Sequence, residues 1–210
     1  MNALEIGRDA RAALAAATRC DVVMTFSRGE VVETDRGEIV WFDCDPEAFS
    51  PKGVLTTPPL NGGGQAPSPV PREGCDLGQA GAPVLHEAFI DACSRFVHVL
   101  AQTSLAEAAP LLLGLGPGLT PSGDDYLGGF LCTLHHLGRP SNIDTAQTHA
   151  ISRARLHMHM RGEGTRAEIR FVRALVHGDD TTEAEATLQT YGHSSGDDFI
   201  RGARAAWSLR

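Results

Sequence analysis

A stretch rich in proline and glycine divides this chain into two parts with different periodicities. Residues 59–83 hold many prolines and glycines and almost no apolar repeat, so we interpret them as a linker or loop at a domain boundary. The segment separates strand-like runs in residues 1–58 from helical spacing in residues 84–210. The pattern predicts an α+β protein with a small N-terminal β-rich domain and a C-terminal α-helical bundle.

The N-terminal part combines one helix with three short strands. Residues 8–17 are rich in alanine and favour a helix. The segment after them, up to Asp43, holds three runs rich in Val, Ile, Phe and Trp, broken at Arg28-Gly29 and Arg36-Gly37. These runs predict a small antiparallel meander with a barrel-like form.

Beyond Val84, apolar residues recur at the three- and four-residue intervals typical of helices that pack by one face. One helix is expected to begin near Ser122 and to end at Gly138 and Pro140. The other expected helices cover 84–102, 104–113, 143–159, 164–177, 181–190 and 196–208.

Composition narrows the classes of partner. A net charge of −8 argues against a nucleic-acid or anionic membrane surface, which leaves small molecules and partner proteins.

The five cysteines form no C-x-x-C pair, so they suggest neither a disulfide framework nor a zinc site. Charged residues interrupt the apolar part of the amino terminus, unlike a signal peptide. We therefore expect a cytoplasmic protein with reduced thiols.

Residues 114–130, GLGPGLTPSGDDYLGGF, surround two adjacent carboxylates with glycines and prolines. Ser122 could cap a helix here, and Asp124 and Asp125 would lie in its first turn, where the positive end of the helix dipole favours carboxylates. A helix start does not require the upstream GLGPGLTP. A rigid loop that exposes several N–H groups is a candidate anion or carbonyl site, and a capped helix start is the alternative.

The sequence PSGDDYLGG at 121–129 recurs as SSGDDFIRG at 194–202. An internal duplication would make two equivalent helix starts, capped by Ser122 and Ser195, that face a common centre. Chance recurrence of a good helix-start sequence is the alternative. The first stretch matches neither the P-loop nor the dinucleotide fingerprint, and Ser122 is not in a G-x-S-x-G elbow, so we do not expect it to act as a nucleophile.

The first stretch, together with YGHSSGDDFIRG near the carboxyl end, resembles the signature of a bacterial domain-of-unknown-function family once labelled as carboxylases. That family includes the AllH-type subunit of oxamate carbamoyltransferase from allantoin degradation. The resemblance covers roughly residues 110–205. It implies a carbamoyltransferase-like or carboxylase-like subunit that acts on a small carboxylate or amide such as oxamate, with partner subunits in an oligomer.

The resemblance and the residue types together suggest roles. Carbamoyl transfer passes through an oxyanion, so it needs N–H donors and a group that moves protons. We expect Asp124, Asp125 and His193 to be catalytic, with Asp124 or Asp125 binding an ammonium group or Mg²⁺ and His193 moving protons. The expected ligand-binding residues are Gly116, Gly118, Thr120, Ser122, Gly123, Ser195, Gly196 and Asp198.

A non-catalytic ligand-binding or assembly subunit is the alternative function. Gly128, Gly129 and Gly202 would then serve to let two helices approach closely. No metal-ligand set can be named from the sequence, although Mg²⁺ is a candidate cofactor.

The arginines between 151 and 173 make this stretch locally basic, and a solvated face is the expected arrangement. If two or more of them point toward the glycine loop, they could hold a carboxylate or carbamoyl phosphate by bidentate bonds. Arg166 is a candidate for that role. His157 and His159, near Arg155 and Arg161, are expected at the surface, because residues two apart point to different faces of a helix.

Overall fold

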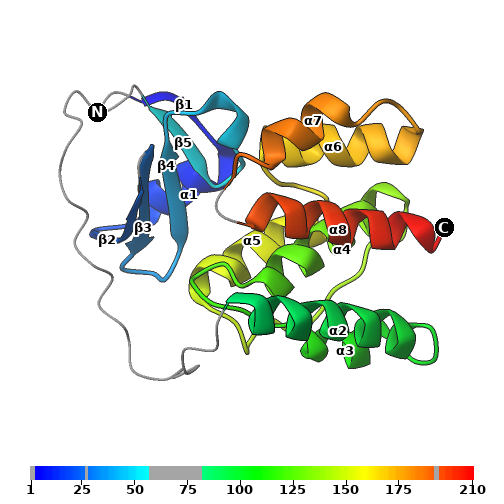
Figure 1. Ribbon diagram of the computed structural model, residues 1–210. Coiled ribbons are helices and arrows are strands. Elements are labelled where there is room, and N and C mark those ends of the chain that lie inside the picture. The colour runs from blue at the N-terminus through cyan, green and yellow to red at the C-terminus, as the bar shows by residue number, and fades with distance from the viewer. Residues whose placement is uncertain (1–2, 27, 57–81, 192–193) are drawn as a thin grey trace. The chain divides into compact units, whose positions relative to one another are not determined.

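The computed structural model describes residues 3–26, 28–56, 82–191 and 194–210, with only the backbone for the first turn of the helix that begins at Ala82. These residues form two compact units, Met1–Asp76 and Leu77–Arg210 (Figure 1). The predicted linker 59–83 lies almost wholly outside the described residues, and the predicted domain limits stay predictions. No helix in the described ranges is long and apolar enough to cross a membrane.

The N-terminal unit is a five-stranded sheet with one helix, α1 (Arg8–Ala16), packed on it. The strands are β1 (Ala3–Ile6), β2 (Cys20–Phe26), β3 (Gly29–Thr34), β4 (Ile39–Asp43) and β5 (Gly53–Thr56). A short 3-10 helix, η1 (Pro46–Ala48), precedes β5. The core under α1 consists of Ala10, Ala13, Val32, Val40 and Val54.

The predicted meander is confirmed in β2, β3 and β4, which pair antiparallel in succession. The sheet order is β1-β5-β4-β3-β2, and β4 and β5 run parallel, so the whole sheet is mixed rather than antiparallel. Strands β1 and β5 were not predicted, because each has only four residues and neither shows an alternating pattern.

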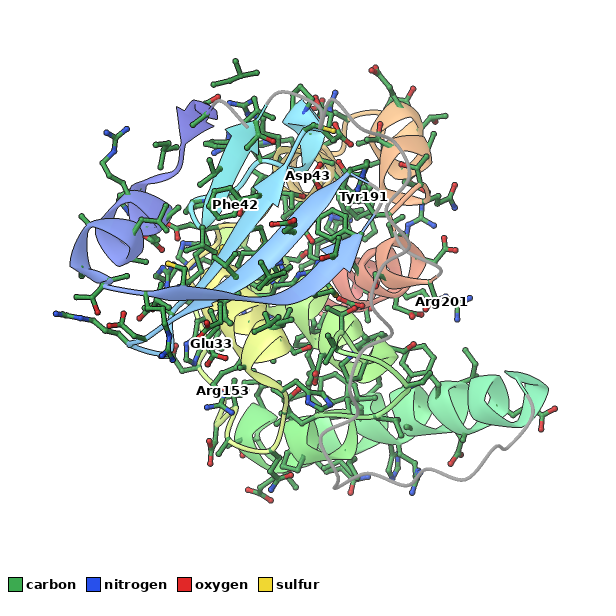
Figure 2. The ribbon with its side chains drawn as sticks, turned by 90° about the vertical axis from the view of Figure 1, so that its left-hand side faces the viewer. Glu33, Phe42, Asp43, Arg153, Tyr191 and Arg201 are labelled. Carbon is green, nitrogen blue, oxygen red and sulfur yellow. The ribbon has the colours of Figure 1, made fainter. Side chains whose placement is uncertain are left out.

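A small group of charged side chains lies at the C-terminal end of strand β4. Figure 2 shows Asp43 and Phe42 on β4 and Glu33 on β3. Asp43 lies beside Arg28, which also contacts Asp45 with Nη1 to Oδ2 at 2.7 Å. Burial raises the pKa of Asp43, against the opposing effects of the Asp45 amide and the Arg28 guanidinium.

The C-terminal unit is helical, as predicted. Its α-helices are α2 (Ala82–Leu100), α3 (Leu105–Ala108), α4 (Ser122–His136), α5 (Ala150–Met160), α6 (Arg166–His177), α7 (Thr182–Leu188) and α8 (Ser195–Ser208), with the 3-10 helix η2 (Ala109–Leu111) after α3. The centre of the unit is α4, whose residues 123–134 are all buried. It packs against α8 along its length (Figure 1).

Two apolar clusters surround α4. One joins it to α2 through edge-to-face contacts of Phe96 with Tyr126 and Phe130. The other joins α6, α7 and α8 around Phe171, Leu188 and Phe199. A helix that is buried on every side needs small residues wherever a neighbouring group comes close, and this requirement accounts for the glycines of α4, which lie against backbone at Gly123 and Gly129 and against the His159 ring at Gly128.

The start of α5 differs from the prediction. The helix was expected from residue 143, but residues 143–149 are not helical and α5 begins at Ala150. Side chains in this segment form hydrogen bonds with the backbone and with neighbouring side chains. Asp144 accepts the Ala146 amide, and Thr145 bonds to His157. Such local hydrogen bonds compete with helix formation, and the apolar spacing does not reveal them.

Candidate functional site

The two repeated motifs meet at the contact between α4 and α8. A Cβ added at Gly129 would overlap the carbonyl oxygen of Phe199, and one added at Gly202 would overlap that of Tyr126. Gly129 and Gly202 hold the same place in the two motifs, as do Tyr126 and Phe199. The two helices therefore touch backbone to backbone. The two contacts are equivalent, because the last glycine of each motif lies against the aromatic residue of the other motif.

The glycines at the two helix starts also allow a close backbone contact, but each contact is with the segment that precedes its own helix. Gly123 leaves room for the carbonyl of Leu112, and Gly196 leaves room for that of Leu188, so each start lies against the turn before it. Two equivalent starts facing one centre is the arrangement expected of an internal duplication, and a chance recurrence would not require it.

Ser122 and Ser195 do not cap their helices, contrary to expectation. Pro121 is the N-cap residue of α4 and Ser194 that of α8, and neither side chain accepts a capping hydrogen bond from an amide of its helix. The motif serines are instead the first helical residues. Their hydroxyls cross between the motifs: that of Ser195 interacts with Asp125, and that of Ser122 with Asp198.

Asp125 and Asp198 are the equivalent second aspartates of the two motifs, and each is only 4% exposed. The Oδ2 atom of each is buried and has no hydrogen-bond partner within the part of the chain that the structure describes. An unsatisfied buried oxygen is costly, so these two atoms mark a place where a proton or a ligand would be stabilising.

The pKa of both carboxyls is raised. Burial raises the pKa of Asp125 to about 7, with contributions from Glu168 and Asp198, against the opposing Arg155 guanidinium and Ser195 hydroxyl. Burial also raises the pKa of Asp198, against opposing effects that include the Ser122 and Ser194 hydroxyls. Asp125 thus titrates near neutral pH, which is where a group that donates and accepts protons is most useful.

Asp124 has a different environment, because both of its oxygens have partners. Oδ1 accepts the Gly114 amide at 2.8 Å, and Oδ2 accepts the Thr148 hydroxyl. Asp124 therefore ties the start of the glycine loop and the segment before α5 to the first turn of α4. Its counterpart Asp197 is exposed and accepts from Gln189.

The loop before α4 is built on three glycines with positive φ: Gly114 at 71°, Gly116 at 120° and Gly118 at 87°. Among the described residues, no acceptor lies opposite four of its amides, those of Gly116, Gly118, Leu119 and Thr120. The Thr120 hydroxyl lies 3.4 Å from that of Ser195, which brings the loop to the start of α8. These N–H groups provide the donors that a carbonyl or anion requires.

Arg155 is half-buried against carboxylates, contrary to the expectation of a surface position. It was expected in a surface cluster, but its Nη1 lies 3.1 Å from Oδ1 of Asp125 and its Nη2 lies 2.6 Å from Oε1 of Glu168. His159 is also inside, at 1% exposure, while His157 and Arg161 are exposed as expected. No local pattern pairs Arg155 with residues of two other helices, although Thr165-x-x-Glu168 is a recognisable capping box.

The predicted site residues thus converge, except where the chain is not described. Gly192 and His193 lie outside the described residues, so the expected role of His193 stays a prediction. Arg166 begins α6 and is exposed. No three His, Cys, Asp or Glu side chains within the described ranges are grouped to hold a metal ion.

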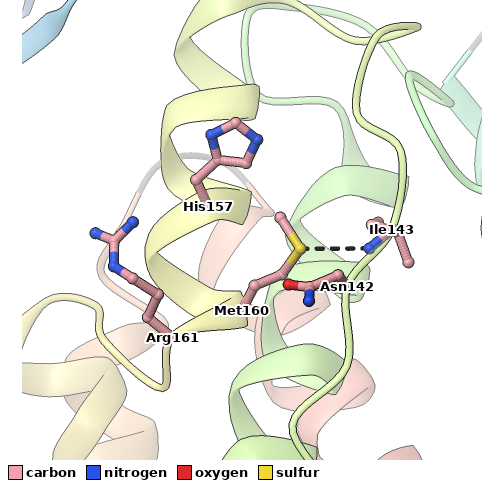
Figure 3. Close-up of a pocket in the computed structure, with 5 residues that line it drawn as sticks. All are labelled: Asn142, Ile143, His157, Met160 and Arg161. Atoms are coloured by element: carbon pink, nitrogen blue, oxygen red, sulfur yellow. Dashed lines mark hydrogen bonds between the residues drawn. The ribbon is translucent and has the colours of Figure 1, made fainter.

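A separate open pocket of about 330 Å³ lies beside α5. It is lined by Asn142, Ile143, His157, Met160 and Arg161, and the Ile143 amide faces the Met160 sulfur at 3.4 Å (Figure 3). None of the predicted site residues lines it.

The comparison with protein families confirms the predicted resemblance. A family model described as oxamate carbamoyltransferase subunit AllH matches residues 112–207, from the end of η2 to the last turn of α8. The match includes both motifs and excludes the N-terminal unit. No curated protein matches the chain, and neither does any solved structure.

Proposed function

We propose that the α4 and α8 starts form the small-molecule site of a carbamoyltransferase-like subunit, which acts on a small carboxylate or amide such as oxamate. The family match over residues 112–207 supports the reaction class. The observation that carries the proposal is the crossed arrangement of Asp125 with Ser195 and Asp198 with Ser122, beside a loop in which four amides have no acceptor among the described residues.

In this proposal the glycine loop binds the oxygen that becomes negative during transfer. The amides of Gly116, Gly118 and Thr120 act as donors to it, because preorganised N–H groups stabilise an oxyanion without reorganising during the reaction. Asp124 holds the loop in place through Gly114 and Thr148.

The two buried carboxyls manage the proton and the amino group. Asp125 titrates near neutral pH, so it gives or takes a proton at little cost. The unpartnered Oδ2 atoms of Asp125 and Asp198 are acceptors for an –NH₂ group. Ser122 and Ser195 orient these carboxyls, and Gly123 and Gly196 let the neighbouring turns approach.

Two elements of the proposal rest on the residue types and the resemblance. His193 follows Gly192 in the second motif and is proposed to relay protons. Mg²⁺ stays a proposed cofactor. The term subunit in the family description also leads us to propose partner chains in an oligomer.

A non-catalytic assembly subunit is the second candidate. The observation that favours it is the close backbone packing of α4 on α8, since Gly129 and Gly202 would be needed for that contact even without a ligand. In that case the crossed serines and aspartates would stabilise the helix pair, and chemistry would belong to a partner.

Calorimetric titration with oxamate, carbamoyl phosphate and Mg²⁺ separates the two candidates. We expect the purified protein to bind oxamate or carbamoyl phosphate, and Asp124→Asn to weaken binding by about tenfold or more because it loosens the loop. Asp91→Asn, at an exposed position of α2, is the matched control and should bind normally. Unchanged binding in Asp124→Asn, or no binding by the wild-type protein, would contradict the proposed site and favour the assembly subunit.

A further inference from the structure

Arg155 in α5 joins two buried carboxylates that come from two other helices. One guanidinium nitrogen contacts Asp125 of α4 at 3.1 Å, and the other contacts Glu168 of α6 at 2.6 Å. The carboxylate side chains are 4% and 3% exposed, whereas the Arg155 side chain is 20% exposed. The planar fork of arginine suits this bridge, because its donors keep a fixed geometry.

Glu168 is itself held from two further directions, so it anchors Arg155. Its Oε2 accepts the Thr165 amide at 2.7 Å and lies 3.3 Å from Nε2 of His159. The His159 ring fits because Gly128 lacks a Cβ, which would overlap the ring. Burial alone would raise the pKa of Glu168, but the Arg155 guanidinium, His159 and the Thr165 amide outweigh it and lower that pKa.

We propose that Arg155 is a positioning residue of the site: by holding Oδ1 of Asp125 against the anchored Glu168, it fixes the direction in which the unpartnered Oδ2 of Asp125 points. This role rests on the proposed function, in which Asp125 handles the proton or the amino group. Arg155 acts through Asp125 and makes no contact with the substrate. The equivalent carboxyl, Asp198, has no such ion pair among the described residues, so the bridge distinguishes the two motif aspartates.

Charges from three helices act on Asp125, and they predict opposite effects for two substitutions. Arg155 of α5 lowers its pKa, whereas Glu168 of α6 and Asp198 of α8 raise it. Asp124 and Glu168 also interact with Arg155. Removing the Arg155 charge should therefore raise the pKa of Asp125, while removing the Glu168 charge should lower it and leave Arg155 to Asp125 alone.

The test is a carboxyl ¹³C NMR titration of the full chain labelled at aspartate, with Asp125 identified by its loss in Asp125→Asn. We expect Arg155→Met to move the Asp125 midpoint upward by about one to three pH units, and Glu168→Gln to move it downward. Arg155→Lys keeps the charge and should restore much of the wild-type midpoint. Arg95→Met, at an exposed site of α2, is the matched control and should leave the midpoint unchanged.

Opposite shifts separate positioning from general damage to the fold, which would move both variants in the same direction. Equal midpoints in wild type, Arg155→Met and Glu168→Gln would overturn the proposal, as would shifts of the same sign. If Arg155→Met does not fold, Arg155→Lys and Glu168→Gln still decide, because a Glu168→Gln midpoint at or above the wild-type value contradicts it. The titration needs no ligand, so opposite shifts in a protein that binds no oxamate would support the bridge and overturn the proposed function.

Discussion

At the scale of single residues, the proposed site centres on buried carboxyls whose environments differ. Asp124 has partners on both oxygens, Asp125 has an arginine on one, and Asp198 has a serine from the opposite motif. Glu168 is fixed by Arg155, His159 and its own helix start. Environments that differ in this way allow neighbouring carboxyls to divide structural and proton-handling roles.

Asp125 should make the protein less stable as the pH rises. Its pKa in the folded state, about 7, exceeds the ordinary value of 3.8, so the folded protein holds a proton that the unfolded chain releases. The contribution of Asp125 to the free energy of unfolding is fully present below about pH 4 and declines as the pH rises to about 7, by roughly 4 kcal/mol at most. Glu168, whose folded pKa is lowered, acts in the opposite direction, and its contribution is lost as the pH falls.

The Asp125→Asn variant isolates this effect. Asparagine keeps an acceptor for Arg155 but does not titrate, so the decline in unfolding free energy between about pH 4 and 7 should be smaller than in the wild type. Urea unfolding at a series of pH values measures it, with Asp91→Asn as the control. Parallel pH profiles for wild type and Asp125→Asn would contradict the assignment.

Thr148 should be as important to the glycine loop as Asp124. Its buried hydroxyl bonds to Asp124, which in turn holds the Gly114 amide. Thr148→Val leaves a buried carboxylate oxygen without a partner, so we expect a loss of about 1–3 kcal/mol in unfolding free energy and faster hydrogen exchange at Gly114. Thr103→Val, at an exposed position just after α2, is the control. Unchanged exchange at Gly114 would show that the tether does not hold the loop.

At the scale of helices, the two starts form one structure built twice. The sequence shows the repeat, because identical Ser-Gly-Asp-Asp residues stand before helices of similar pattern, and a common centre was one of the two interpretations that it left open. The prediction that Ser122 and Ser195 cap their helices was wrong. A serine that follows a proline or another serine can be either the N-cap or the first helical residue, and the backbone conformation decides which. Arg155 and Thr148 reach the centre from distant positions, and helical periodicity carries no information about such contacts.

Equivalent glycines should respond alike to substitution. Gly129→Ala and Gly202→Ala each place a methyl group against a carbonyl of the opposite helix, Phe199 or Tyr126. We expect each to lose about 1–3 kcal/mol or more in unfolding free energy, despite the better helix propensity of alanine. Arg201→Ala, at an exposed position of α8 labelled in Figure 2, should change stability by about 0.5 kcal/mol or less. A stabilised Gly202→Ala would rule out the close contact.

At the scale of the whole chain, each unit has its own apolar core. The clusters around α4 contain only residues of the helical unit, and the cluster under α1 contains only residues of the sheet unit. Composition predicted this division, because strand-like and helical patterns lie on either side of the proline- and glycine-rich segment. The parallel pairing of β5 could not be predicted, since four residues carry too little pattern to specify a neighbour.

The fragment Leu77–Arg210 should therefore fold by itself. It contains every residue of the core around α4, so we expect a helical circular dichroism spectrum and one cooperative thermal transition. The same fragment carrying Gly202→Ala is the control and should melt at lower temperature. A fragment that is helical but melts without cooperativity would show that its core is incomplete.

The central claim is that Asp125 and Asp198 belong to one ligand site, and a double-mutant cycle for oxamate binding tests it most directly. Calorimetry on the wild type, Asp125→Asn, Asp198→Asn and the double variant gives the coupling between the two carboxyls. We predict weaker binding in each single variant and a coupling energy of at least about 0.5 kcal/mol. Additive effects, full binding by both single variants, or no binding by the wild type would contradict a single site formed by the two helix starts.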